Sequence, residues 1–276
     1  MPRELVTVQV GQCGNQIGCR FWDVALREHA AMNQSGVYDD ALSSFFRNES
    51  LSTKGSRQLP VGSQISSLRA RAVLIDSEEG VLKATLNGPL GQLFDSRHII
   101  SDQYGAGNNW AQGHMEYGPK YREEVLESVR RTVETCDSLQ SFFLMHSLGG
   151  GTGSGLGTYV LSLLADHYPD VYRFTCSVFP SQDDDVVTSP YNSALALEQL
   201  SEHADCVIPL ENSSLAEICR RVEARTGGGT GKGGQPGQTG QTLAGGRANA
   251  NSFDEMNNIA AQVLLLLLYY SRPTAE

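Results

Sequence analysis

The sequence of 276 residues is poor in positive charge, with 21 Lys and Arg against 31 Asp and Glu and a formal net charge of -10. Its basic residues are scattered along the chain and form no basic segment. Proteins that bind nucleic acid or an anionic membrane surface usually gather Lys and Arg on one face. We therefore expect no nucleic-acid partner and no membrane partner.

Three further features are missing. The six cysteines form no CxxC pair and have no His at zinc-ligand spacing. The first residues lack the charged, apolar and small-residue regions of a secretory signal peptide. The longest apolar run, Val263 to Tyr270, is well short of the roughly 20 residues that span a bilayer. We expect reduced thiols, a cytoplasmic protein, and a buried core helix at this run.

Strand-like and helix-like segments alternate along the chain. A β-branched run over Leu5 to Val10 leads through a glycine turn, Gly11 to Gly18, into a helix that ends near His29. Further units follow: a strand over Ala72 to Ile75 ending at Asp76, a strand over Phe142 to Met145 with a helix over Gly157 to His167, a strand over Tyr172 to Phe179 with a helix over Tyr191 to His203, and a strand over Cys206 to Leu210 with a helix over Leu215 to Val222. Such repetition predicts an α/β fold with a parallel sheet, Rossmann-like, and helices on both faces.

One of these strands ends in a glycine-rich stretch, Gly149 to Gly155, which reads GGGTGSG. Ligands of such sheets bind at the carboxyl ends of the strands. Without side chains, several backbone N–H groups can converge on one anion beside the N-terminus of the next helix. The stretch therefore predicts a phosphate site. The alternative is that the glycines only permit tight packing of a strand-to-helix turn.

The stretch matches neither a Walker loop nor a dinucleotide fingerprint on a first βα turn. It instead resembles the signature loop of the tubulin superfamily, and GQCGNQIG at Gly11 to Gly18 resembles the N-terminal loop of that family. GAGNNWA at Gly105 to Ala111 and SPYN at Ser189 to Asn192 complete the set in the same order. Four ordered motifs make the resemblance specific, and it implies a tubulin-type nucleotide-binding domain.

Two stretches, Phe45 to Asn48 and Ala70 to Asp76, resemble the epsilon branch of the superfamily. The connection between them is longer than alpha or beta tubulins carry. The resemblance to this branch implies a cytoskeletal role at the centrosome, in centriole or basal-body microtubule organisation. It also implies other tubulins (alpha, beta, delta) or centriolar proteins as partners.

The resemblance implies that the chain binds GTP or GDP. The resemblance places Gln12, Cys13 and Gln16 against the phosphates and the guanine. It places two further segments against the phosphates: Ala106, Gly107 and Asn108, which sense the γ-phosphate, and Ser147, Gly149, Gly150, Gly151, Thr152 and Gly153. For Cys13 the alternative is a small buried thiol. For Gly105 and Gly107 the alternative is a turn with a structural role only.

The resemblance also implies Mg²⁺, held through water by Asp76 and Glu78 at the end of a strand. A hard dication that keeps several waters suits such a sparse acidic loop. The neighbouring Glu79, which stands where the family usually has proline, is interpreted as a solvated charge.

At the other end of the site, the resemblance assigns the guanine to Asn212, Phe253 and Asn257. An Asn amide can pair with the base edge while an aromatic ring stacks on its face. Phe253 stands where tyrosine is usual, and Ser189 where many tubulins have glutamate, so the ribose contact is expected to be weaker or shifted to Asp185. The run Asp183 to Asp185 is otherwise a solvated acidic face.

We predict a GTP-binding domain over residues 1–225, a flexible Gly-rich insertion over 226–252, and a central core helix with a tail over 253–276. The intermediate and C-terminal domains of the family are expected to be absent. In the family, the acid that positions the attacking water comes from the intermediate domain of the next subunit. No catalytic residue is therefore assigned, and GTP hydrolysis is expected only where a neighbouring subunit supplies that acid.

Two alternatives stay open. The first is a tubulin-like scaffold that carries no active nucleotide and acts only through protein contacts, as the departures at Ser189 and Phe253 would allow. The second is a dinucleotide-dependent oxidoreductase. That enzyme would need an early GxGxxG with an acid about 20 residues further on, which GQCGNQIG does not supply.

Overall fold

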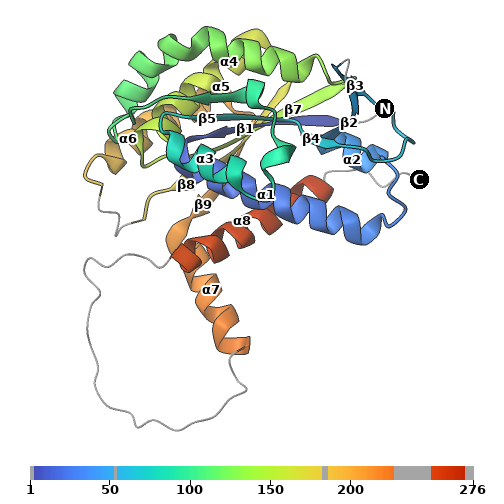
Figure 1. The fold of residues 1–276 in the computed structure, drawn as a ribbon. Helices are drawn as coiled ribbons and strands as arrows, with labels where there is room; N and C mark the ends of the chain where they lie inside the picture. The colour runs from blue at the N-terminus through green and yellow to red at the C-terminus, as the bar shows by residue number, and fades with distance from the viewer. Residues whose placement is uncertain (1–2, 53–54, 182–185, 227–249, 271–276) are drawn as a thin grey trace.

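The computed structural model describes residues 3–52, 55–181, 186–226 and 250–270. Its centre is a six-stranded sheet in the order β6-β5-β1-β7-β8-β9, with all neighbouring strands parallel (Figure 1). The strands are β1 (Glu4–Val10), β5 (Ala72–Asp76), β6 (Ile99–Ser101), β7 (Leu139–Ser147), β8 (Tyr172–Phe179) and β9 (Cys206–Glu211). The chain builds outward from β1 to β6, then returns to the other side of β1 for β7. Ligands of such sheets bind at this reversal of strand order, at the carboxyl ends of β1 and β7.

Helices cover both faces of the sheet, as the sequence predicted (Figure 1). The adjacent residues Phe142 and Phe143 of β7 belong to two different cores because successive side chains of a strand point to opposite faces. One core contains residues of α1 and α8, and the other contains residues of α4, α5 and α6. The helix bounds are α1 Gly11–Met32, α2 Asp40–Phe45, α3 Glu79–Asn87, α4 Gly118–Val133, α5 Gly157–His167, α6 Ser189–His203, α7 Asn212–Thr226 and α8 Ala250–Tyr270.

The glycine turn predicted after β1 is wrong, because α1 begins at Gly11 itself. Within Gly11 to Gly18, only Gly11 has the left-handed conformation of a turn, with φ +75°. A Cβ atom on Gly14 would lie 2.1 Å from the carbonyl oxygen of Met145, and one on Gly18 would meet the side chain of Gln9. These two glycines therefore let α1 lie directly on the sheet.

A second, antiparallel sheet of β2 (Phe46–Ser52), β3 (Gly55–Gln58) and β4 (Leu68–Ala70) fills the long connection before β5. The sequence analysis did not predict it. The buried Arg71 side chain joins this region to the main sheet: it forms an ion pair of 2.7 Å with Glu4 and donates hydrogen bonds to the carbonyls of Ser43 and Thr135. The connection is thus tied to the amino ends of the central strands, away from their carboxyl ends.

The predicted core helix near the end of the chain is present as α8, but only one of its faces is buried. Ala260, Ala261 and Leu264 pack into the core with α1. Leu266 and Leu267 on the other face are about half exposed. None of the helices within the described ranges is long and apolar enough to cross a membrane. Most of the predicted Gly-rich insertion, at 227–249, and the tail at 271–276 lie outside the described residues.

Candidate functional site

The segments that follow β1, β5 and β7 meet at the carboxyl ends of these strands. A Cβ atom on Gly11, after β1, would lie 3.1 Å from the backbone nitrogen of Gly153. The hydroxyl of Ser77, after β5, shares a hydrogen bond with the hydroxyl of Thr152. Residues that are more than 130 positions apart in the sequence, Gly11 and Thr152 among them, therefore line one small region.

The glycine stretch after β7 has two kinds of glycine. At Gly151, a Cβ atom would lie 2.6 Å from the backbone nitrogen of Asn109 and 2.7 Å from the carbonyl oxygen of Ala106. At Gly150, the nearest atom to a Cβ would be the side-chain oxygen of Asn108, at 3.7 Å. Gly151 is therefore explained by packing against the loop after β6. Packing does not explain Gly150, because a Cβ atom there would make only ordinary van der Waals contacts.

The loop after β6 lies next to Gly150. Gly107 and Asn108 both have left-handed backbones, with φ +55° and +51°, and Asn108 is the one non-glycine residue with positive φ among the described residues. Its carbonyl oxygen accepts hydrogen bonds from Thr188 and Asn192, at 2.6 and 2.8 Å. Ala106 is buried, whereas Gly107 and Asn108 are exposed. The loop thus turns an amide side chain toward Gly150.

Two carboxylates lie at the end of β5. Asp76 is buried, and burial raises the pKa of its carboxyl to about 6. One of its oxygens accepts a hydrogen bond of 3.3 Å from the backbone of Glu78, and the other has no hydrogen-bond partner. Glu78 is exposed and lies against Gly105. Within the described ranges no group of three or more His, Cys, Asp or Glu could hold a metal.

An acidic pair with one unsatisfied oxygen suits Mg²⁺, which usually takes one or two carboxylates and keeps several waters or phosphate oxygens. Glu79 differs from its neighbour, because it pairs with Lys83 one helical turn away. That pairing agrees with its interpretation as an ordinary surface charge.

A histidine that the sequence analysis did not select supports the glycine stretch from behind. His146 is fully buried, with Nδ1 at 2.9 Å from the carbonyl oxygen of Gly153 and Nε2 at 2.8 Å from the hydroxyl of Ser177. Since a carbonyl only accepts, Nδ1 carries the proton and Nε2 accepts from Ser177. Burial lowers the pKa of His146 to about 4, so the ring is neutral. The sequence feature that could have identified His146 is its position as a polar residue at the end of the apolar run FFLM.

The residues predicted at the start of α1 lie on its first two turns, directly after β1. Gln12 is exposed, while Cys13 and Gln16 are half-buried. Burial raises the pKa of the Cys13 thiol to about 12, and Cys13 packs against the core that contains Met256 of α8. The structure thus agrees with a neutral, packed thiol, and a ligand contact at Cys13 stays a prediction.

The residues predicted to contact guanine lie on two other helices. Asn212 begins α7, and Phe253 and Asn257 lie on the first turns of α8. An ion pair of 3.2 Å between Arg20 and Asp254 joins α8 to α1. No hydrogen bond links these three residues to the glycine stretch in the part of the chain that the structure describes. Asp185, the predicted ribose contact, lies outside that part.

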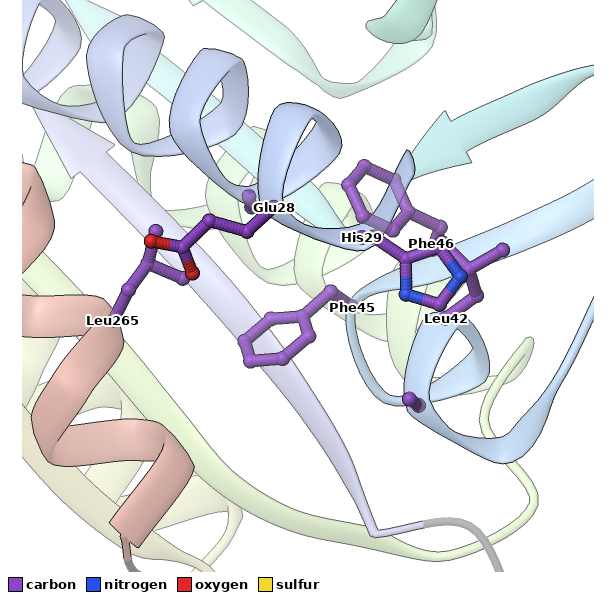
Figure 2. Close-up of a pocket in the computed structure, with 8 residues that line it drawn as sticks. Glu28, His29, Leu42, Phe45, Phe46 and Leu265 are labelled. Atoms are coloured by element: carbon purple, nitrogen blue, oxygen red, sulfur yellow. The ribbon is translucent and has the colours of Figure 1, made fainter. Parts of the chain in front are cut away.

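Two hollows lie away from the glycine stretch. A gap of about 20 Å³ separates α1, α2 and α8 next to His29, Phe45 and Leu265 (Figure 2). It holds a single water at most. A larger, mainly apolar hollow of about 650 Å³ lies between β8, β9, α7 and α8, and Glu211 and Ser214 beside Asn212 form part of its wall.

Comparison with known proteins agrees with the fold and these loops. Residues 4–220 match the Tubulin/FtsZ family, GTPase domain, so the chain belongs to this family. It is 54% identical to the tubulin epsilon chain of Mus musculus and 52% identical to that of Homo sapiens, in each case over 270 residues, which are 97% of this chain and 57% of the relative. It is 43% identical to the tubulin beta-6 chain of Gossypium hirsutum over 226 residues, which are 80% of this chain and 48% of the relative.

The two epsilon relatives support the branch that the sequence predicted. The chain spans little more than half the length of these relatives.

Proposed function

We propose that the chain binds GTP or GDP with the nucleotide phosphates at the carboxyl ends of β1 and β7. The observation that carries this proposal is Gly150, where packing does not require a glycine and a Cβ atom would lie 3.7 Å from the side-chain oxygen of Asn108. Backbone N–H groups of Gly150 to Gly153 and the hydroxyl of Thr152 are the donors available there. Such donors, together with the N-terminus of the following helix, favour a phosphate.

Asp76 and Glu78 would hold Mg²⁺ beside these phosphates. The ion, when bound, neutralises negative charge that develops on the phosphate oxygens. The chain itself contributes the carboxylates and keeps Asp76 in place through the backbone N–H of Glu78.

The magnesium proposal has a matched pair of variants. Glu78→Gln removes a carboxylate from the acidic pair, and Glu79→Gln removes the neighbouring charge that pairs with Lys83. We expect Glu78→Gln to weaken the Mg²⁺ dependence of GTP binding and Glu79→Gln to leave it unchanged. The measurement is a GTP titration with and without Mg²⁺. Equal behaviour of the two variants would remove Glu78 from the metal site.

We further propose that the chain acts in the microtubule cytoskeleton at centrioles or basal bodies, with other tubulins or centriolar proteins as partners. The support is its similarity to two tubulin epsilon chains over nearly its whole length. Imaging of a tagged chain tests this proposal. A signal concentrated at centrioles is the expected result, and a uniformly diffuse signal would argue against it.

One observation favours the alternative of a nucleotide-inert scaffold. Ser189, which stands where many tubulins have glutamate, is buried, and its hydroxyl donates a hydrogen bond of 3.4 Å to the carbonyl of Gly149. This position therefore contributes to loop packing, and the chain has no carboxylate at this point.

Nucleotide content separates the two functions. The chain is purified with Mg²⁺, denatured, and any released nucleotide is identified by ion-exchange chromatography. We expect stoichiometric guanine nucleotide in the native chain and in Thr152→Ser, which keeps the hydroxyl. Thr152→Ala and Asn257→Asp should lose it. A folded chain that carries no nucleotide and takes up none when GTP is added would support the scaffold.

A further inference from the structure

Asn192, in the first turn of α6, joins three segments of the molecule. Its side chain is buried, and its amide nitrogen donates hydrogen bonds of 2.8 Å to the carbonyls of both Asn108 and Gly149. Its amide oxygen accepts a hydrogen bond of 2.9 Å from the backbone nitrogen of Trp110. An Asn amide has two N–H donors and one carbonyl oxygen, so both carbonyls and the Trp110 N–H are matched at once. One side chain thus ties the loop after β6 to the loop after β7.

The contact with Asn108 falls on a strained backbone. A left-handed conformation at a non-glycine residue persists where its surroundings fix it. Here the carbonyl of Asn108 is held on one side by Thr188 and Asn192. The side-chain oxygen of Asn108 lies beside Gly150, 3.7 Å from where a Cβ atom would be. The two hydrogen bonds from the α6 side therefore set where the Asn108 amide points.

The loop after β6, which carries Asn108, is also fixed at Trp110. The indole N–H of Trp110 donates to the hydroxyl of Thr158 on α5, at 3.2 Å, and the Trp110 ring stacks on His114 with a centroid distance of 4.3 Å. Asn192 and the contacts of Trp110 therefore hold the loop that carries Asn108 at two points. Movement of Asn108 away from Gly150 would break the hydrogen bond between its carbonyl and the buried side chain of Asn192, and a buried donor is expensive to leave unpaired.

From these contacts we infer that Asn192 is a positioning residue, which holds Asn108 in reach of the terminal phosphate and so sets the preference of the site for nucleoside triphosphate over diphosphate. The inference rests on the proposed function, because it concerns the same nucleotide. Asn192 does not contact the nucleotide in this role. It acts through Asn108 and Gly149.

Asn192→Asp tests the inference with little change in shape. The aspartate keeps an oxygen for the N–H of Trp110 but turns a second oxygen toward two carbonyls, so the tie is lost. We expect triphosphate affinity to fall about tenfold relative to diphosphate affinity. The measurement is a titration with fluorescent N-methylanthraniloyl GTP and GDP, beside a thermal melt that verifies folding.

Ser193→Ala is the matched control. Ser193 is the next residue on α6, and its hydroxyl donates a hydrogen bond of 3.3 Å to the carbonyl of Leu148 without contacting Asn108. We expect an unchanged ratio of the two affinities in this variant. An equal loss of both affinities in Asn192→Asp would show that Asn192 only stabilises the fold, and an unchanged ratio would also overturn the inference.

Two further measurements keep the inference testable on its own. If Asn192→Asp does not fold, Thr188→Val removes one of the two hydrogen bonds on the Asn108 carbonyl, and an unchanged affinity ratio there overturns the inference. If the native chain binds neither nucleotide, the proposed function fails and the role in nucleotide preference fails with it. Amide hydrogen exchange at residues 105–111 then decides whether Asn192 holds the loop: faster exchange in Asn192→Asp is expected, and unchanged exchange contradicts it.

Discussion

Two neighbouring glycines lack side chains for different physical reasons. An alanine at position 151 would collide with backbone atoms of Asn109 and Ala106, so Gly151→Ala should lower the free energy of unfolding by about 1–3 kcal/mol. An alanine at position 150 meets only an ordinary contact, so Gly150→Ala should keep the native stability and lose the nucleotide. Chemical denaturation together with nucleotide content distinguishes the two. Native nucleotide binding in Gly150→Ala would contradict a phosphate at this glycine.

His146 makes the stability of the protein depend on pH. Its pKa is about 4 in the folded state against an ordinary value of 6.5, so below pH 6.5 the unfolded chain binds a proton that the folded chain does not. Stability should therefore fall by up to a few kcal/mol between about pH 6.5 and 4. Burial also lowers the pKa of His98 to about 4, so His98 makes the loss of stability with falling pH steeper.

His146→Asn tests the contribution of this one residue, because Asn can still donate to the Gly153 carbonyl but does not titrate. Urea denaturation across the same pH range should give a shallower slope for this variant than for the native chain. If the unfolding free energy of the variant changes with pH as steeply as that of the native chain, His146 is not the cause of the pH dependence.

The helices and strands that the sequence predicted correctly are those with a local signal. The strand Tyr172–Phe179 and the helix Gly157–His167 have the predicted bounds, because continuous apolar runs and helical periodicity are local features. The start of α1 was wrong because its glycines indicate a turn by propensity, whereas contact with β7 keeps the segment helical. The sheet β2–β4 was missed because its attachment depends on ion pairs such as Arg71 with Glu4, which are 67 residues apart.

That ion pair gives a prediction at the element level. Arg71→Ala would leave the carboxylate of Glu4 buried without its partner, which should cost about 3–5 kcal/mol of unfolding free energy. As a control, Arg220→Ala breaks an exposed ion pair with Glu217 and should cost no more than about 1 kcal/mol. Urea denaturation measures both. A small loss in Arg71→Ala would mean that the second sheet does not depend on this anchor.

For the whole molecule, the sequence located the glycine stretch, the acidic pair and the family. It did not identify His146 or the tie made by Asn192, because hydrogen bonds between residues as far apart as Asn108 and Asn192 leave no local pattern. The assignments of Asn212, Phe253, Asn257 and Asp185 to the nucleotide stay predictions. So does the division into a domain over 1–225, an insertion over 226–252 and a helix with a tail.

A ligand that binds only the folded chain should stabilise the whole molecule. At a GTP concentration of 100 times the dissociation constant, the gain is about 2.7 kcal/mol. For a chain of this size, we expect the Tm to rise by roughly 5–10 °C. Thermal melts with GTP, GDP and ATP measure this, and ATP should have little effect. Equal shifts with ATP and GTP would contradict recognition of the guanine base.

The most direct measurement is a structure of the chain bound to a slowly hydrolysed GTP analogue and Mg²⁺. Phosphate oxygens about 3 Å from the backbone nitrogens of Gly150 to Gly153 are the predicted result. A nucleotide bound elsewhere, or no nucleotide at the glycine stretch at saturating analogue, would contradict the assignment of this stretch to the phosphates.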